Sequence, residues 1–147
     1  MNNPISAKVT LWTNRTIAAV LVILVFCMPF LLNWYRSVRL MERIPTNAIL
    51  VAFYCCVPAV GAALWDLDKI LRNILQGRIF VPANVNCIRR IRWYCLVVGV
   101  ICLPAAFFYP PLIFISVIMG FLALVVCVVA NAWRGAVELR EENDLTI

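Results

Sequence analysis

The chain has 147 residues, of which 65% are hydrophobic and only 14% charged, and its formal net charge is +6. Soluble domains average roughly 45–50% apolar and 25% charged residues. A water-soluble protein of this length could not bury so much apolar surface, so the composition excludes an ordinary soluble domain. It predicts a single membrane domain over residues 1–147.

Long runs without charged residues predict the membrane helices. Residues 16–35 and 44–65 form the first two runs, and about 20 apolar residues are enough to cross the hydrocarbon. The third run, residues 93–133, is 41 residues long and carries Pro110-Pro111 near its middle. Because consecutive prolines break a helix, this run predicts two crossings joined by a tight turn. The predicted fold is therefore an all-α integral membrane four-helix bundle, with spans near 16–34, 48–65, 91–108 and 112–133.

The residues at the ends of the spans support this interpretation. The first span is followed by Asn33-Trp34-Tyr35-Arg36 and not by a small-x-small cleavage pattern, so it is interpreted as a retained anchor and not a signal peptide. All five tryptophans lie at predicted span ends, where amphipathic rings favour the lipid headgroups.

The distribution of Lys and Arg predicts the orientation. If both termini lie on the inner side, ten basic residues are inside and three, Arg36, Arg39 and Arg43, are outside. The positive-inside rule then places both termini and the segment between spans two and three in the cytoplasm.

That middle segment is expected to begin as a helix. Apolar residues at 67, 70, 71, 74 and 75 have helical spacing, which predicts a cytoplasmic amphipathic extension of the second helix with Gly77 in the C′ position. Pro82, Asn84 and Asn86 are predicted to form a turn, with Asn84 or Asn86 capping the third helix.

Two charged groups are candidate contact sites. The basic residues of the middle segment are expected to anchor the protein on anionic lipid or, alternatively, to bind an acidic partner; direct nucleic-acid binding is not expected, since no recognition module is present. The C-terminal tail is expected to contact a partner, to fold against the basic loop or to remain solvated. The candidates are Lys69, Arg72, Arg78, Arg89, Arg90 and Arg92 in the segment, and Glu138, Glu141, Glu142 and Asp144 in the tail.

Small residues recur at helical spacing in the last two spans. Membrane helices associate through close contact at such residues, so these stripes are predicted to face the bundle interior, while a homo-oligomer interface is the competing use. The stripes are Cys95, Gly99, Cys102 and Ala106 in the third span and Ser116, Gly120, Ala123, Cys127 and Ala130 in the fourth.

Metal, cofactor and enzymatic chemistry are not expected. The chain has no histidine and no C-x-x-C pair, and its seven cysteines are interpreted as reduced packing residues. Asp66 and Asp68, the only acidic pair near the membrane, are interpreted as exposed charges at a helix exit. No charge is predicted at mid-membrane depth, which argues against ion-coupled transport.

Two segments resemble a known family. Gly77-Arg78-Ile79-Phe80, with Asn84-Val85 and Ile88-Arg89-Arg90-Ile91, and the ending Gly135-x-x-x-Leu139-x-Glu141-Glu142-Asn143-Asp144-Leu145-Thr146-Ile147 are similar to the bacterial four-span family catalogued as domain of unknown function 2975. Val81-Pro82-Ala83 departs from the Ser/Thr-x-Glu expected before Asn84. The resemblance implies a bacterial cytoplasmic membrane and no known enzymatic activity.

Members of that family are often encoded beside a small Cro/CI-type helix-turn-helix regulator. The resemblance therefore implies a non-enzymatic membrane protein that binds or controls such a cytoplasmic regulator. The alternative hypothesis is a small transporter or immunity-type protein that acts within the bilayer, which would need a polar or lipid-accessible cavity between spans.

Overall fold

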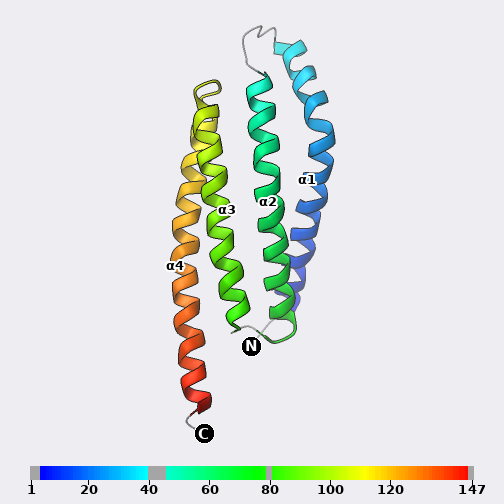
Figure 1. The fold of residues 1–147 in the computed structure, drawn as a ribbon. Coiled ribbons are helices and arrows are strands. Elements are labelled where there is room, and N and C mark those ends of the chain that lie inside the picture. Colours follow the sequence, from blue (N-terminus) through cyan, green and yellow to red (C-terminus); the bar gives the residue numbers. More distant parts are fainter. Residues whose placement is uncertain (1–3, 40–45, 79–80, 146–147) are drawn as a thin grey trace.

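The computed structural model describes residues 4–39, 46–78 and 81–145 and contains four α-helices. The helices run alternately in opposite directions, so both ends of the described chain lie toward the α2–α3 connection, and the end of α4 extends beyond it (Figure 1). The all-α prediction of four helices is confirmed. Their bounds are α1 Pro4–Arg39, α2 Thr46–Leu75, α3 Pro82–Ala106 and α4 Leu112–Leu145.

The four helices of the predicted bundle are arranged as an open row. Within the described residues, α2 packs on α1 and α3, and α3 packs on α2 and α4, while α1 contacts neither α3 nor α4. Large apolar side chains such as Phe26 and Phe114 remain uncovered. Lipid solvates such side chains as well as protein does, so a membrane chain gains little by closing the row.

Three of the helices are long and apolar enough to cross a membrane. These candidate spans are Ala7–Tyr35 in α1, Asn47–Leu75 in α2 and Leu112–Arg140 in α4. The charge-free part of α3 covers only residues 93–106, about 21 Å of helix, whereas the hydrocarbon is about 30 Å thick. The fourth crossing that the sequence predicts is therefore a proposal, taken up below.

The proline turn lies where the sequence predicts it. α3 ends at Ala106 and α4 begins at Leu112, and the amides of Phe108 and Tyr109 donate hydrogen bonds back to the Ala105 carbonyl. This hairpin brings the two small-residue stripes together. Gly99 and Ser116 meet there, with the Ser116 hydroxyl donating a 2.8 Å hydrogen bond to the Gly99 carbonyl.

α2 continues as a helix beyond Asp66 and ends at Leu75. Its apolar side includes the buried Ile70 and Leu71. Gly77 has φ +75° and occupies the predicted C′ position: its amide donates to the Ile74 carbonyl at 3.0 Å, and the Arg78 amide donates to the Asn73 carbonyl at 2.9 Å. This pair of bonds is the Schellman motif, which glycine favours because it has no Cβ.

We expect Gly77→Ala to lower the free energy of unfolding by about 1 kcal/mol, because a side chain is disfavoured in the left-handed region. Titration of the chain with sodium dodecyl sulfate in mixed micelles, followed by circular dichroism, measures this change. Gly135→Ala is the matched control, since Gly135 is helical and a Cβ there meets nothing within 4 Å. Equal effects of the two substitutions would contradict the role given to Gly77.

The predicted asparagine cap of the third helix is wrong. α3 begins at Pro82, with Val81 at the N-cap and no side-chain capping bond. Proline suits the first helical position because its φ is already helical and its missing amide would have no partner there. Asn84 therefore lies inside the first turn of α3, and its side chain is completely buried.

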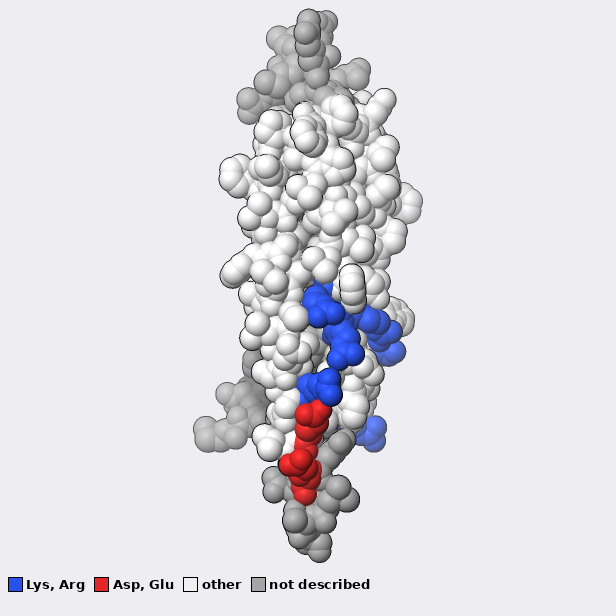
Figure 2. All heavy atoms as spheres, turned by 60° about the vertical axis from the view of Figure 1, so that its left-hand side comes forward, with Lys and Arg blue, Asp and Glu red and all other residues white. Residues whose placement is uncertain are grey.

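Charged residues gather toward one end of the molecule. On the face shown in Figure 2, Lys, Arg, Asp and Glu occupy the lower part and the described upper part is free of them. We call this region the charged end. It comprises Lys8 and Arg15 of α1, α2 after Trp65, the connection to α3, α3 before Trp93, and α4 after Trp133.

Candidate functional site

Two carboxylates on α2 link three helices at the charged end. Asp66 and Asp68 are two residues apart, so they point about 200° apart around the helix. The Asp66 carboxylate faces α3 and lies 3.2 Å from the Arg90 guanidinium. The Asp68 carboxylate faces α1 and pairs with Arg15 at 3.4 Å, and it also pairs with Arg72 one turn along α2 at 2.6 Å.

These pairs correct the interpretation of both aspartates as exposed charges. The Asp66 side chain is only 6% exposed and that of Asp68 only 17% exposed. A buried carboxylate is tolerated when it is paired with a cation, and α2 supplies such pairs to the helix on either side. The two aspartates thus fix how α1 and α3 align along α2.

The Arg90 guanidinium has two partners. It donates a hydrogen bond to the Cys87 sulfur at 3.4 Å and pairs with Asp66. The Cys87 contact, followed by the Asp66 charge, raises the pKa of Arg90 above its ordinary value. Arg90 therefore keeps its positive charge throughout the physiological pH range.

The Arg92 side chain contacts α4 within the charge-free stretch of that helix. Its guanidinium donates to the Cys127 sulfur at 3.3 Å and lies 5.5 Å from the centre of the Trp93 ring. Cys127 precedes Arg134 by about two helical turns, or about 10 Å. Arg92 thus connects α3 to the charge-free stretch of α4, and its Nε has no partner among the described residues.

Asn84, in the first turn of α3, forms hydrogen bonds with α2 and with the α2–α3 connection. Its side-chain oxygen accepts a 2.7 Å hydrogen bond from the side-chain amide of Asn73 in α2. Its side-chain nitrogen donates a hydrogen bond of 3.2 Å to the backbone carbonyl of Arg78. The sequence analysis assigned Asn84 to a cap and missed this role. Pro82 could have indicated this role from the sequence. Proline favours the first helical position, and a helix that begins at Pro82 includes Asn84.

We expect Asn84→Leu to lower the free energy of unfolding by about 1–3 kcal/mol, because the Asn73 amide and the Arg78 carbonyl then lose a buried partner. The detergent titration used for Gly77→Ala applies here. Asn86→Leu is the control, since Asn86 is exposed two residues further on. If Asn86→Leu proved as damaging as Asn84→Leu, the hydrogen-bonded link would not explain the loss.

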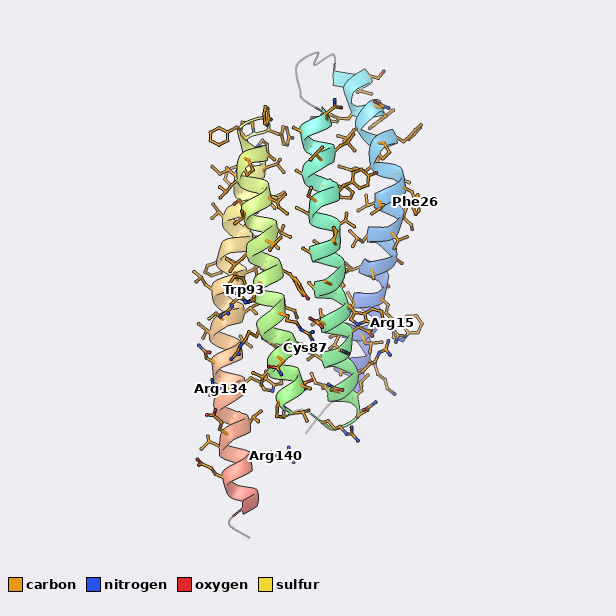
Figure 3. All side chains as sticks on the ribbon, viewed as in Figure 1. Arg15, Phe26, Cys87, Trp93, Arg134 and Arg140 are labelled. Carbon is orange, nitrogen blue, oxygen red and sulfur yellow. The ribbon has the colours of Figure 1, made fainter. Side chains whose placement is uncertain are left out.

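The other predicted contact residues are spread over the charged end. Lys69, Arg78 and Arg89 are exposed, and Glu138 pairs with Arg134 at 2.8 Å. Arg89, Arg134 and Glu138 line a shallow depression of about 300 Å³ between α3 and α4. Glu142 is exposed, while the side chains of Glu141 and Asp144 lie outside the described residues. Figure 3 shows how Arg15, Cys87, Arg134 and Arg140 are distributed over the helices of this end.

The predicted packing residues of α3 lie on its buried side. Cys95, Gly99 and Cys102 are buried, and a Cβ on Gly99 would lie 3.4 Å from the Ser116 carbonyl oxygen. On α4, Ser116 and Ala123 are buried, whereas Gly120 and Cys127 are half-buried. A Cβ on Gly120 would meet nothing within 4 Å, so the close approach of the hairpin depends on Gly99.

A grouping that could hold a metal is not found in the described part of the chain, where no three His, Cys, Asp or Glu side chains come together. The arrangement at the charged end consists of ion pairs between helices and of exposed charges around them. Exposed arginines are chemically suited to anionic groups, and exposed carboxylates are suited to cationic ones.

Comparison with known proteins identifies a family but no characterised relative. A family model described as "Protein of unknown function (DUF2975)" matches residues 4–147. No curated protein matches the chain, and no solved structure matches it.

Proposed function

The chain belongs to the family described as Protein of unknown function (DUF2975), and we propose that it is a non-enzymatic, multi-pass protein of the bacterial cytoplasmic membrane that acts through contacts at its charged end. The single observation that carries this proposal is the length of α4. α4 continues as a helix to Leu145, about 18 Å beyond Trp133, and projects past the other three helices (Figure 1).

The projecting part of α4 carries charged residues and one large apolar side chain that the described chain leaves uncovered. Val137 is buried where α4 passes the start of α3, but Leu139 two residues later is 63% exposed. Exposed apolar side chains on a charged helix are typical of helices that bind in a groove. The tail after Trp133 carries four acidic and two basic residues, so the complementary partner surface is basic.

A small helix-turn-helix regulator has such a surface, because DNA-binding proteins present basic residues to phosphates. Binding of the acidic α4 tail to that surface would compete with DNA and hold the regulator at the membrane. The family resemblance, in which such regulators are encoded nearby, supports the same partner.

The distribution of basic residues supports the proposed orientation. The charged end holds ten of the thirteen Lys and Arg residues, which supports a cytoplasmic position for it and for both termini. This arrangement requires α3 to cross although its charge-free part is short. The exposed Arg89 side chain can reach back to the interface, and the Asp66 carboxylate neutralises Arg90.

A direct binding measurement tests the proposal. The full chain is placed in lipid nanodiscs and titrated with a purified Cro/CI-type helix-turn-helix regulator, with and without operator DNA. We expect micromolar or tighter binding that weakens at least tenfold in Glu138→Lys/Glu142→Lys and is competed by the DNA. Lys8→Glu is the control, since it changes a charge on α1. No binding, or equal binding by the tail variant and the control, would refute the proposal.

A second candidate function is the handling of an apolar molecule within the bilayer. An apolar groove of about 610 Å³ lies between α2 and α3 away from the charged end, with Val51, Cys55, Ile101 and Phe108 among its lining residues. Such a groove is the lipid-accessible cavity that a transporter or immunity-type protein would need. Protection of cells against a hydrophobic toxin, lost in Ala52→Trp, would favour this function over regulator binding.

A further inference from the structure

A second groove, between α1 and α2, joins charged and apolar side chains. It has a volume of about 310 Å³, which is within the range of small-molecule sites. We propose that this groove, which we call the α1–α2 groove, binds the phosphate-bearing headgroup and the first part of an acyl chain of an anionic glycerophospholipid. Its lining residues fall into a polar set, Asn14, Arg15, Asp68 and Arg72, and an apolar set that includes Ala18, Leu21, Val22, Gly61, Leu64 and Trp65.

The polar end of the groove carries a surplus positive charge. Arg15 and Arg72 both pair with Asp68, so two cations share one carboxylate. The Asp68 carboxylate is paired with Nε of Arg15 and with a terminal nitrogen of Arg72, and both arginine side chains remain more than half exposed, at 52% and 58%. The remaining N–H groups can bind a phosphodiester, for which guanidinium geometry is well suited.

Asn14 adds an unsatisfied acceptor to the same end. The residue is 4% exposed, and its amide nitrogen donates a 3.1 Å hydrogen bond to the Leu64 carbonyl. Its Oδ1 has no partner among the described residues. A buried acceptor without a donor is costly, so the described chain leaves one hydrogen bond unmade at this end of the groove.

The apolar end leaves room for an acyl chain. A Cβ on Gly61 would meet nothing within 4 Å, so the absence of a side chain there opens the groove beside Leu21 and Val22. The polar residues belong to the charged end, and the apolar ones belong to the charge-free stretches of α1 and α2. A headgroup at the first set therefore places its acyl chain along the second, as in a bilayer leaflet. The binding of lipid here does not depend on the regulator proposed above.

Fluorescence of Trp65, which lines the groove and is 71% exposed, reports the occupant. The experiment uses a variant in which Trp65 is the only tryptophan, with Trp12, Trp34, Trp93 and Trp133 changed to Phe. The variant is placed in phosphatidylcholine vesicles in which one-tenth of the lipid is brominated. We expect brominated phosphatidylglycerol to quench Trp65 at least threefold more than brominated phosphatidylcholine does.

Three variants test the origin of this preference. Arg72→Gln should abolish the preference for phosphatidylglycerol. Lys69→Gln should leave it unchanged, because Lys69 is also a cation of α2 but does not line the groove. Gly61→Leu should reduce quenching by both lipids, because the side chain fills the acyl position. Excess inorganic phosphate should leave the preference unchanged.

Equal quenching by both lipids, or the same loss in Lys69→Gln as in Arg72→Gln, would overturn the proposal. Displacement by inorganic phosphate would also overturn it, because the groove would then be a site for a free anion. If the single-tryptophan chain does not fold, native mass spectrometry of the unmodified chain and of Arg72→Gln replaces the quenching. We expect the unmodified chain to retain more phosphatidylglycerol than Arg72→Gln does. Equal retention by the two chains would contradict the proposal.

Discussion

Replacing Arg90 by glutamine is expected to lower the free energy of unfolding substantially, because it leaves the Asp66 carboxylate buried without its cation. An uncompensated buried charge costs roughly 3–5 kcal/mol. Asp66 is 4% exposed and its Oδ2 already lacks a partner among the described residues, so little water can reach it. The loss is measured by detergent titration of the full chain in mixed micelles.

The double variant Asp66→Asn/Arg90→Gln separates the pair from other effects. With no charge left to bury, it should recover most of the stability that the single variant loses. Arg89→Gln removes a neighbouring exposed arginine and should change stability little. A double variant less stable than Arg90→Gln alone, or an equal loss in Arg89→Gln, would show that the ion pair does not hold α2 and α3 together.

Replacing Gly99 by leucine is expected to force α3 and α4 apart. Even a Cβ at this position would lie 3.4 Å from the Ser116 carbonyl oxygen and 3.7 Å from the Met119 Cβ, so a larger side chain has no space. Overpacking of this kind costs about 1–3 kcal/mol, and the Ser116–Gly99 hydrogen bond is lost as well. Disulfide trapping between cysteines placed across the hairpin measures the separation.

Gly120→Leu is the matched control for Gly99→Leu. Because the space around Gly120 is open, the hairpin should accept this change. Chemical crosslinking in nanodiscs adds a second reading: a change in oligomeric state caused by Gly120→Leu alone would indicate that this part of α4 contacts another copy of the chain. Equal destabilisation of the hairpin by both substitutions would contradict the assignment of the close contact to Gly99.

Local sequence signals predicted the helices and several of their ends. Pro110-Pro111 marked the turn, because proline acts on its immediate neighbours, and Gly77 marked the end of α2 through its backbone conformation. The cap at Asn84 was predicted wrongly because two local rules competed there. Proline at the first helical position determined where α3 begins.

Contacts between distant residues could not be predicted in this way. Arg15 and Asp68 are 53 positions apart, and nothing in a single sequence indicates that they meet. Asp66 looked like an exposed charge because it directly follows a membrane-length apolar run, although only the packing of α3 determines its burial. The open row could not be predicted from the sequence either, because an apolar helix face has the same sequence pattern whether lipid or protein covers it.

The orientation of the charged end is the central claim, because a cytoplasmic regulator can reach the tail of α4 only if that end faces the cytoplasm. Cytoplasmic and periplasmic activity reporters fused after Arg78, after Tyr109 and after Ile147 test it directly. We predict cytoplasmic activity at Arg78 and Ile147 and periplasmic activity at Tyr109, which requires α3 to cross. Cytoplasmic activity at Tyr109 with periplasmic activity at Ile147 would contradict the account, because α3 would not cross and the acidic tail would lie outside the cell.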